Sequence, residues 1–249
     1  MKRRLARCLQ VALAALPLLG LAACLPGRPA ALMPTQQVPA RVPAQMLVVV
    51  LPGRADDLAG LRASGIVEAI QRGRPDADVL LAGATLPYYF EGRLVERLHA
   101  LIEPARGRYR EVWMVGASLG GLGALLYERE HPGRLDGLLL LAPYMGRGAL
   151  VEEVQAAGGP AAWQPAPRPA QLDADNPPHE AWRVVHDWAQ RPQDARRVWL
   201  VCGRDDGFVT AARMIAPLLP EGHYRERDGG HRWSVWSAAA AGIFAENGA

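Results

Sequence analysis

The chain has 249 residues, half of them hydrophobic, and a formal net charge of +3. This length and composition can supply the core of one α/β domain or of two small domains. Removing the four cationic residues of the leader, which contains no acid, changes the net charge from +3 to about −1. The four cationic residues are Lys2, Arg3, Arg4 and Arg7. The sequence therefore gives no support for nucleic-acid binding.

The N-terminal segment has the layout of an export signal. Its basic start precedes an apolar stretch over residues 11–21, and it ends in Leu21-Ala22-Ala23-Cys24. This ending resembles the signal of bacterial lipoproteins, which implies a signal peptide over residues 1–23 and an acylated Cys24 in the cell envelope. The alternative is a plain membrane anchor, but the apolar residues 11–25 number about 15, and a spanning helix needs about 20.

A proline-rich segment follows the signal. Five prolines lie between residues 25 and 44, and this composition predicts a semi-stiff tether without a core, so residues 24–44 are expected to separate the anchor from the folded domain. Leu25 is not an aspartate, and the lipoprotein resemblance then implies the outer membrane. Cys8 leaves with the signal and Cys202 has no partner, so no disulfide is expected.

From residue 45 onward, strand-like and helix-like segments alternate. Strands are expected at residues 45–51, 78–83, 112–116, 138–142, 197–202 and 224–226. Helices are expected at residues 56–71, 92–103, 119–130, 208–219 and 232–244, with Asp56 or Asp57 capping the first. This alternation predicts an α/β fold over residues 45–249, with a mostly parallel sheet of about six strands flanked by helices.

One turn carries a candidate nucleophile. Gly116-Ala117-Ser118-Leu119-Gly120 joins an expected strand to an expected helix. Glycines two positions on either side of the serine permit a sharp turn that lifts its hydroxyl clear of the sheet. The sequence therefore predicts Ser118 as the nucleophile of a covalent mechanism.

A serine hydroxyl needs a base, and the base needs an acid that orients it. His231 is the expected base, because Gly229 and Gly230 permit a turn that presents its imidazole after the last strand. His131, at the end of the helix behind the serine, suits the helix dipole better, and His186 belongs to the long insertion described below.

These segments together resemble the α/β-hydrolases of the serine esterase and lipase type, in which the acid lies between serine and histidine in the chain. The spacing Gly203-x-x-Asp206-x-x-Val209 is similar to that family's acid loop and favours Asp206, with Asp205 as the alternative. The two antiparallel strands that often begin this fold are expected to be missing, because only the tether lies there.

Two backbone N–H groups are expected to stabilise the oxyanion. Leu119, directly after the nucleophile, supplies one by position. The loop after the first strand supplies the other; relatives often read His-Gly there, whereas this chain has Pro52 and Gly53. The resemblance then implies Arg54 as the second donor, since proline has no N–H to give.

The insertion over residues 143–195 is long for a connection between core strands. Helix-like pieces at 149–157 and 180–190 and three tryptophans predict a small cap over the serine, with a peripheral decoration as the alternative. The cap and the aromatic loop at residues 87–90 are expected to select the substrate, although core packing would equally explain the loop.

The sequence thus predicts an anchored serine hydrolase that cleaves carboxylic esters through an acyl-serine and needs no cofactor. Its expected partners are a small-molecule ester or acyl substrate and, through Cys24, a membrane. A thioesterase or acyltransferase would use the same residues. A non-catalytic binding lipoprotein of this fold is a further alternative, and no ligand-spaced histidines support a metal-dependent hydrolase.

Overall fold

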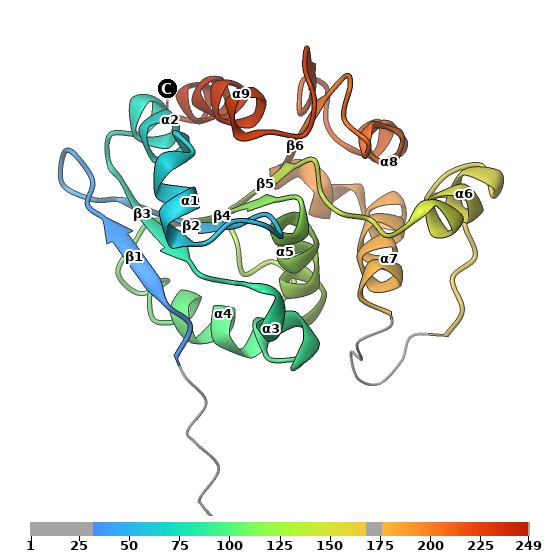
Figure 1. Ribbon diagram of the computed structural model, residues 1–249, viewed down its shortest axis with the longest axis horizontal. Helices are drawn as coiled ribbons and strands as arrows, with labels where there is room; N and C mark the ends of the chain where they lie inside the picture. The colour runs from blue at the N-terminus through green and yellow to red at the C-terminus, as the bar shows by residue number, and fades with distance from the viewer. Residues whose placement is uncertain (1–31, 168–175, 249) are drawn as a thin grey trace, which may run out of the picture. The chain divides into compact units, whose positions relative to one another are not determined.

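The computed structural model describes residues 32–167 and 176–248, and its folded unit begins at Met33 (Figure 1). The predicted signal peptide and Cys24 lie outside the described residues. The sheet of this unit has the order β1-β3-β2-β4-β5-β6-β7, in which only β1 is antiparallel to its neighbour. Its strands are β1 (Thr35–Val38), β2 (Met46–Leu51), β3 (Ala77–Ala82), β4 (Glu111–Ala117), β5 (Gly137–Leu141), β6 (Val198–Gly203) and β7 (Tyr224–Arg227).

The α/β prediction is confirmed. Every residue of β2, β5 and β6 is buried, as expected for parallel strands covered on both faces. Helices α2 and α9 cover one face of the sheet, and α4, α5 and α7 cover the other (Figure 1). The helices are α1 (Leu58–Ala63), α2 (Ile66–Gly73), α3 (Leu86–Phe90), α4 (Leu94–Ile102), α5 (Leu119–Glu130), α6 (Gly148–Ala156), α7 (Pro177–Gln190), α8 (Val209–Ile215) and α9 (Trp233–Glu246).

Strand β1 corrects the prediction that residues 24–44 form only a tether and that no antiparallel strand precedes the parallel sheet. Its pairing with β3 is supported by Asp78, a carboxylate that is only 9% exposed. Asp78 accepts hydrogen bonds from Gln37 Nε2 (2.8 Å), the Ala40 N–H (2.7 Å) and the Tyr109 hydroxyl (2.6 Å). These partners are distant in sequence, so the local composition did not reveal the strand.

The helix expected over residues 56–71 is two helices. The chain bends at Gly65, whose φ of 78° ends α1 and starts α2. Asp57 is the N-cap of α1, since its side chain accepts the Gly60 N–H at 2.8 Å, and Asp56 has a different role. The aromatic segment at residues 87–90 belongs to the short helix α3 and is not a loop.

The insertion over residues 143–195 divides into two parts with different positions. Helix α7 packs against α5 and is the crossover helix between β5 and β6, so it does not act as the predicted cap. Its Glu180 is fully buried and bonds Arg129 Nε at 2.7 Å and Arg183 Nε at 2.8 Å. Of the predicted cap, only the first part of the insertion, which contains α6, can cover the carboxyl ends of the strands.

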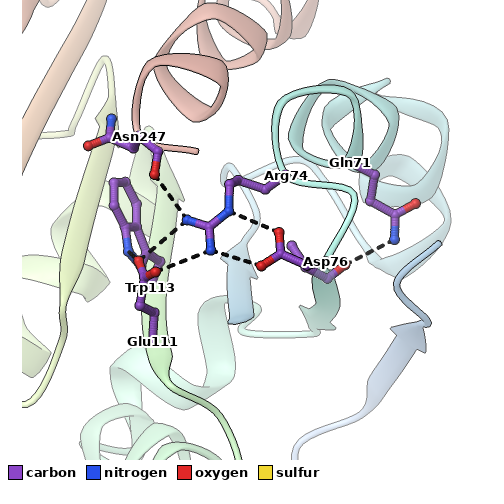
Figure 2. A network of polar contacts seen from close by, with 7 residues as sticks. Gln71, Arg74, Asp76, Glu111, Trp113 and Asn247 are labelled. Carbon is purple, nitrogen blue, oxygen red and sulfur yellow. Dashed lines mark hydrogen bonds and ion pairs between the residues drawn. The ribbon is translucent and has the colours of Figure 1, made fainter. Parts of the chain in front are cut away.

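A polar network closes the amino ends of β3 and β4. Figure 2 shows the Arg74 guanidinium between two carboxylates and a backbone carbonyl. Arg74 bonds Asp76 at 2.9 and 3.0 Å, Glu111 at 3.1 Å and the Asn247 carbonyl oxygen at 3.2 Å. It thereby ties the C-terminal end of α9 to the sheet. Among the residues that the structure describes, no helix has the length and apolarity needed to cross a membrane.

Candidate active site

The predicted strand-to-helix turn is present at the carboxyl end of β4. Ser118 has φ 52° and ψ −112°, a conformation that is strained for a residue with a side chain. A Cβ atom on Gly116 would lie 2.3 Å from the Gly120 carbonyl oxygen, and one on Gly120 would lie 2.6 Å from the Leu51 carbonyl oxygen. Glycine is therefore required at both positions, because the opposing atoms belong to the backbone.

The surrounding structure holds the serine in this conformation. Its N–H donates to the Leu141 carbonyl at 2.8 Å, and its carbonyl accepts the Tyr144 N–H at 2.9 Å. The Tyr89 hydroxyl donates to the Leu119 carbonyl at 2.9 Å, and burial strongly raises the pKa of Tyr89. The Tyr89 phenol therefore stays protonated and supports the turn, so this member of the aromatic segment has a packing role.

Asp206 and His231 come together although they lie on separate loops, after β6 and β7. His231 Nδ1 is 2.8 Å from Asp206 Oδ2 and 3.0 Å from Oδ1. Asp206 is 3% exposed and also accepts the Phe208 N–H at 2.9 Å. Asp205 is exposed, so of the two adjacent aspartates Asp206 is the partner of His231.

The glycines of these loops permit their close approach. A Cβ atom on Gly203 would lie 2.3 Å from the Gly229 carbonyl oxygen. Gly229 has φ 109°, which a residue with a side chain rarely adopts. The histidine loop therefore lies directly on the aspartate loop because both residues lack a side chain.

Two aromatic rings pack against the imidazole, and one of them connects it to the serine turn. Phe208 and Trp236 contact the His231 ring edge-on, with centroid distances of 4.9 and 4.7 Å. Tyr144, whose N–H binds Ser118, packs on Phe208 at 5.6 Å. No hydrogen bond joins Ser118 to His231 directly in the described part of the chain, and such contacts often tighten only when substrate binds.

The loop over residues 52–56 lies beside the serine. A Cβ atom on Gly53 would be 3.8 Å from Ser118 Cβ. The Gly53 N–H donates to Asp56 Oδ2 at 3.2 Å, and Arg54 is exposed. Leu119 is the first residue of α5, so its N–H has no acceptor within the helix.

A cavity of about 480 Å³ lies between α6 and α8. Tyr144 and Phe208 line it on the side of His231. Val151 and Glu152 of α6 and Ala211 of α8 also line it. Sequence reasoning missed Tyr144 and Phe208 as neighbours of the site, and it did not foresee the partners of the Asp56 side chain. Phe208 stands two residues after Asp206 and so could have been found.

Other candidate residues lie elsewhere. His131 stacks on His99 at 3.9 Å at the far end of α5, and burial lowers the pKa of His131. His186 and His223 each bond a backbone carbonyl through Nδ1 at 2.9 Å. Burial raises the pKa of Cys202 to about 12, which disfavours a reactive thiolate. Within residues 32–167 and 176–248, no three His, Cys, Asp or Glu side chains gather to hold a metal ion.

The sheet order, the strained serine turn and the loops after β6 and β7 define an α/β-hydrolase. The chain belongs to the esterase family, whose model, described as “Putative esterase”, matches residues 81–246. It is therefore a hydrolase. The match includes Ser118, Asp206 and His231 but not the loop over residues 52–56. The sequence matches no curated protein.

Solved structures share this fold at low sequence identity. Est1E from Butyrivibrio proteoclasticus is 16% identical with a TM-score of 0.56, and the match covers 86% of this chain and 91% of that one. A monoacylglycerol lipase from Paleococcus ferrophilus is 14% identical with a TM-score of 0.55, over 86% and 98%. FphF, a serine hydrolase of Staphylococcus aureus, is 10% identical with a TM-score of 0.59, over 85% and 91%.

Proposed function

We propose that this hydrolase cleaves carboxylic esters of small molecules through an acyl-serine, with Ser118 as nucleophile, His231 as base and Asp206 as acid. The contact between Asp206 and His231 Nδ1 carries the proposal. The carboxylate favours the tautomer with its proton on Nδ1, which leaves Nε2 free to accept the Ser118 hydroxyl proton.

The proposed reaction has two steps. Ser118 Oγ bonds to the ester carbonyl carbon while its proton passes to His231 Nε2. Leu119 N–H and Arg54 N–H stabilise the oxyanion, and the alcohol leaves with the proton from His231. His231 next takes a proton from water, whose oxygen attacks the acyl carbon. As the bond between Ser118 Oγ and this carbon breaks, His231 returns the proton to Oγ, and the carboxylic acid is released.

The small-molecule substrate is supported by the cavity and by one relative. The cavity of about 480 Å³ beside Phe208 falls within the range of small-ligand sites. Est1E has been solved with ferulic acid bound.

We further propose that an acylated Cys24 anchors the enzyme to the bacterial envelope. Fractionation of the expressing cells tests this proposal, because acylation would retain the activity in the membrane fraction.

The decisive test compares full-length wild type with Ser118→Ala on p-nitrophenyl acetate and butyrate, with fluorophosphonate labelling of both. Ser118→Ala is expected to lower kcat by about 10⁴-fold or more and to abolish labelling, because the nucleophile is lost. Ser234→Ala, an exposed serine on α9, is the control and should keep both signals. A folded wild type with neither turnover nor labelling would contradict the proposal.

A further inference from the structure

A hydrogen bond connects the loop beside Ser118 to the helix that follows His231. Trp233 Nε1, in the first turn of α9, donates to Asp56 Oδ2 at 2.9 Å across 177 residues of sequence. The same oxygen accepts the Gly53 N–H at 3.2 Å, and the Asp56 N–H donates to the Gly53 carbonyl at 3.2 Å. The loop is thus closed on itself and held by α9.

Helix capping does not explain Asp56. Asp57 caps α1, as its bond to the Gly60 N–H shows. The Asp56 carboxylate is half-buried and directed to Gly53 and Trp233 instead. Adjacent aspartates therefore serve different parts of the molecule.

The loop lies where small displacements affect the reaction. A Cβ atom on Gly53 would be 3.8 Å from Ser118 Cβ and 3.0 Å from Asp56 Oδ2, so Gly53 lies between the nucleophile and this carboxylate. Because the Gly53 N–H is used by Asp56, the Arg54 N–H is the next donor that the loop can offer to the oxyanion. A shift of about 1 Å in such a donor strongly weakens transition-state stabilisation.

The same helical turn also supports the base. Trp233 packs edge-on against Trp236 at 5.3 Å, and Trp236 packs edge-on against His231 at 4.7 Å. The start of α9 therefore contacts both the imidazole and, through Asp56, the loop beside the serine.

We propose that Asp56 and Trp233 are positioning residues that hold the Arg54 N–H in the oxyanion site, an inference that rests on the proposed function. Asp56 acts as a hydrogen-bond acceptor for two donors and takes no part in proton transfer. An asparagine oxygen also has two lone pairs, so Asp56→Asn should retain most of the activity that Asp56→Ala loses.

The test measures steady-state kinetics and the rate of fluorophosphonate labelling in the full-length protein. Trp233→Phe and Asp56→Ala are each expected to lower kcat roughly tenfold or more, with KM within about twofold of wild type. Labelling should slow in parallel, because the phosphonyl oxygen uses the same donors. The double variant should lose no more activity than the more severely impaired single variant, since both changes break the same hydrogen-bonded link.

Two controls separate positioning from general stability. Trp113→Phe removes an indole donor to Glu111, at 3.2 Å, at the amino end of β4 and away from the site, and should leave kcat unchanged. Asp57→Ala removes the cap of α1 and should lower the melting temperature without lowering kcat.

Three results would overturn the inference. The first is wild-type kcat in folded Trp233→Phe and Asp56→Ala. The second is multiplied losses in the double variant, which would mean that the two residues act independently. The third is an Asp56→Asn variant as slow as Asp56→Ala. A wild type without turnover or labelling would overturn the proposed function and this inference with it, so the two failures are distinguishable.

Discussion

Ser118 illustrates how a strained residue depends on its neighbours. Its positive φ is unfavourable by itself, at about 1–3 kcal/mol, and persists because the backbone of β5 and residue 144 bonds it on both sides. Gly120 is part of this support, since it lets the turn approach β2 to within contact of the Leu51 carbonyl. The position of the nucleophile is therefore set by backbone packing around it.

Gly120→Ala tests this packing. The added Cβ would lie 2.6 Å from Leu51 O and 2.7 Å from Pro52 O, so the backbone must move, and we expect a loss of about 1–3 kcal/mol in the free energy of unfolding. Urea denaturation measures the change. Gly107→Ala, whose added Cβ meets nothing within 4 Å, should stay within about 0.5 kcal/mol of wild type. Equal effects at the two positions would contradict the explanation.

At the scale of elements, the insertion after β5 has two separate tasks. Helix α7 completes the layer that covers the sheet, and Trp182 within it donates to the Met145 carbonyl at 2.8 Å. Helix α6 instead lines the cavity beside Phe208. The part of the insertion that contacts substrate is thus expected to be α6 and the segment before it.

Val151→Trp tests whether the cavity binds the acyl group of the ester. The larger side chain would fill space next to Phe208, so kcat/KM for long or aromatic acyl esters should fall about tenfold or more while acetate is little affected. Ala149→Trp, at an exposed position of the same helix that does not line the cavity, is the control. A uniform loss over all esters would show that Val151→Trp disturbs the fold and not the selectivity.

At the scale of the whole molecule, ion pairs make the fold sensitive to acid. The Arg74 guanidinium lowers the pKa of Asp76, and Arg213 with Tyr224 lowers the pKa of Glu226 to about 2. A carboxyl group with a lowered pKa in the folded state stabilises the protein above its unfolded pKa, near 4, and this contribution disappears as the pH falls through the folded pKa. Burial lowers the pKa of His131, so acidification below about 6.5 acts in the same direction.

The free energy of unfolding is therefore expected to fall steadily from pH 7 to pH 3, measured by urea denaturation at each pH. Arg74→Met should cost about 2 kcal/mol at pH 7, because it leaves Asp76 and Glu111 without their shared partner. The difference in the free energy of unfolding between this variant and wild type should narrow toward acid pH, because the contribution of Asp76 disappears as the pH falls through its lowered folded pKa. Arg72→Met, an exposed neighbour, should follow wild type throughout. A difference in the free energy of unfolding between Arg74→Met and wild type that is constant with pH would contradict an ionic origin of this stabilisation.

Much of this protein could be predicted from local sequence. The continuous apolar runs of β2 and β5 and the glycines around Ser118 specify strands and a sharp turn through short-range sterics and burial. The helix expected at residues 119–130 is α5 with the same bounds. For the same reason Ser118, His231 and the pair Asp205 and Asp206 could be named as candidates in advance, since each follows a recognisable strand.

Other features depended on the tertiary structure, because they arise from contacts between distant segments. Strand β1 forms on Asp78, 38 to 41 residues away from its donors Ala40 and Gln37, and no local pattern marks it. The choice of Asp206 over Asp205 as the neighbour of His231 depends on which carboxylate turns inward beside β7. The bond from Trp233 to Asp56 joins the start of α9 to the loop after β2, which is 177 residues away in the sequence. The sequence by itself determined the class of fold and the types of residue for the chemistry, and three-dimensional packing decided which of them meet.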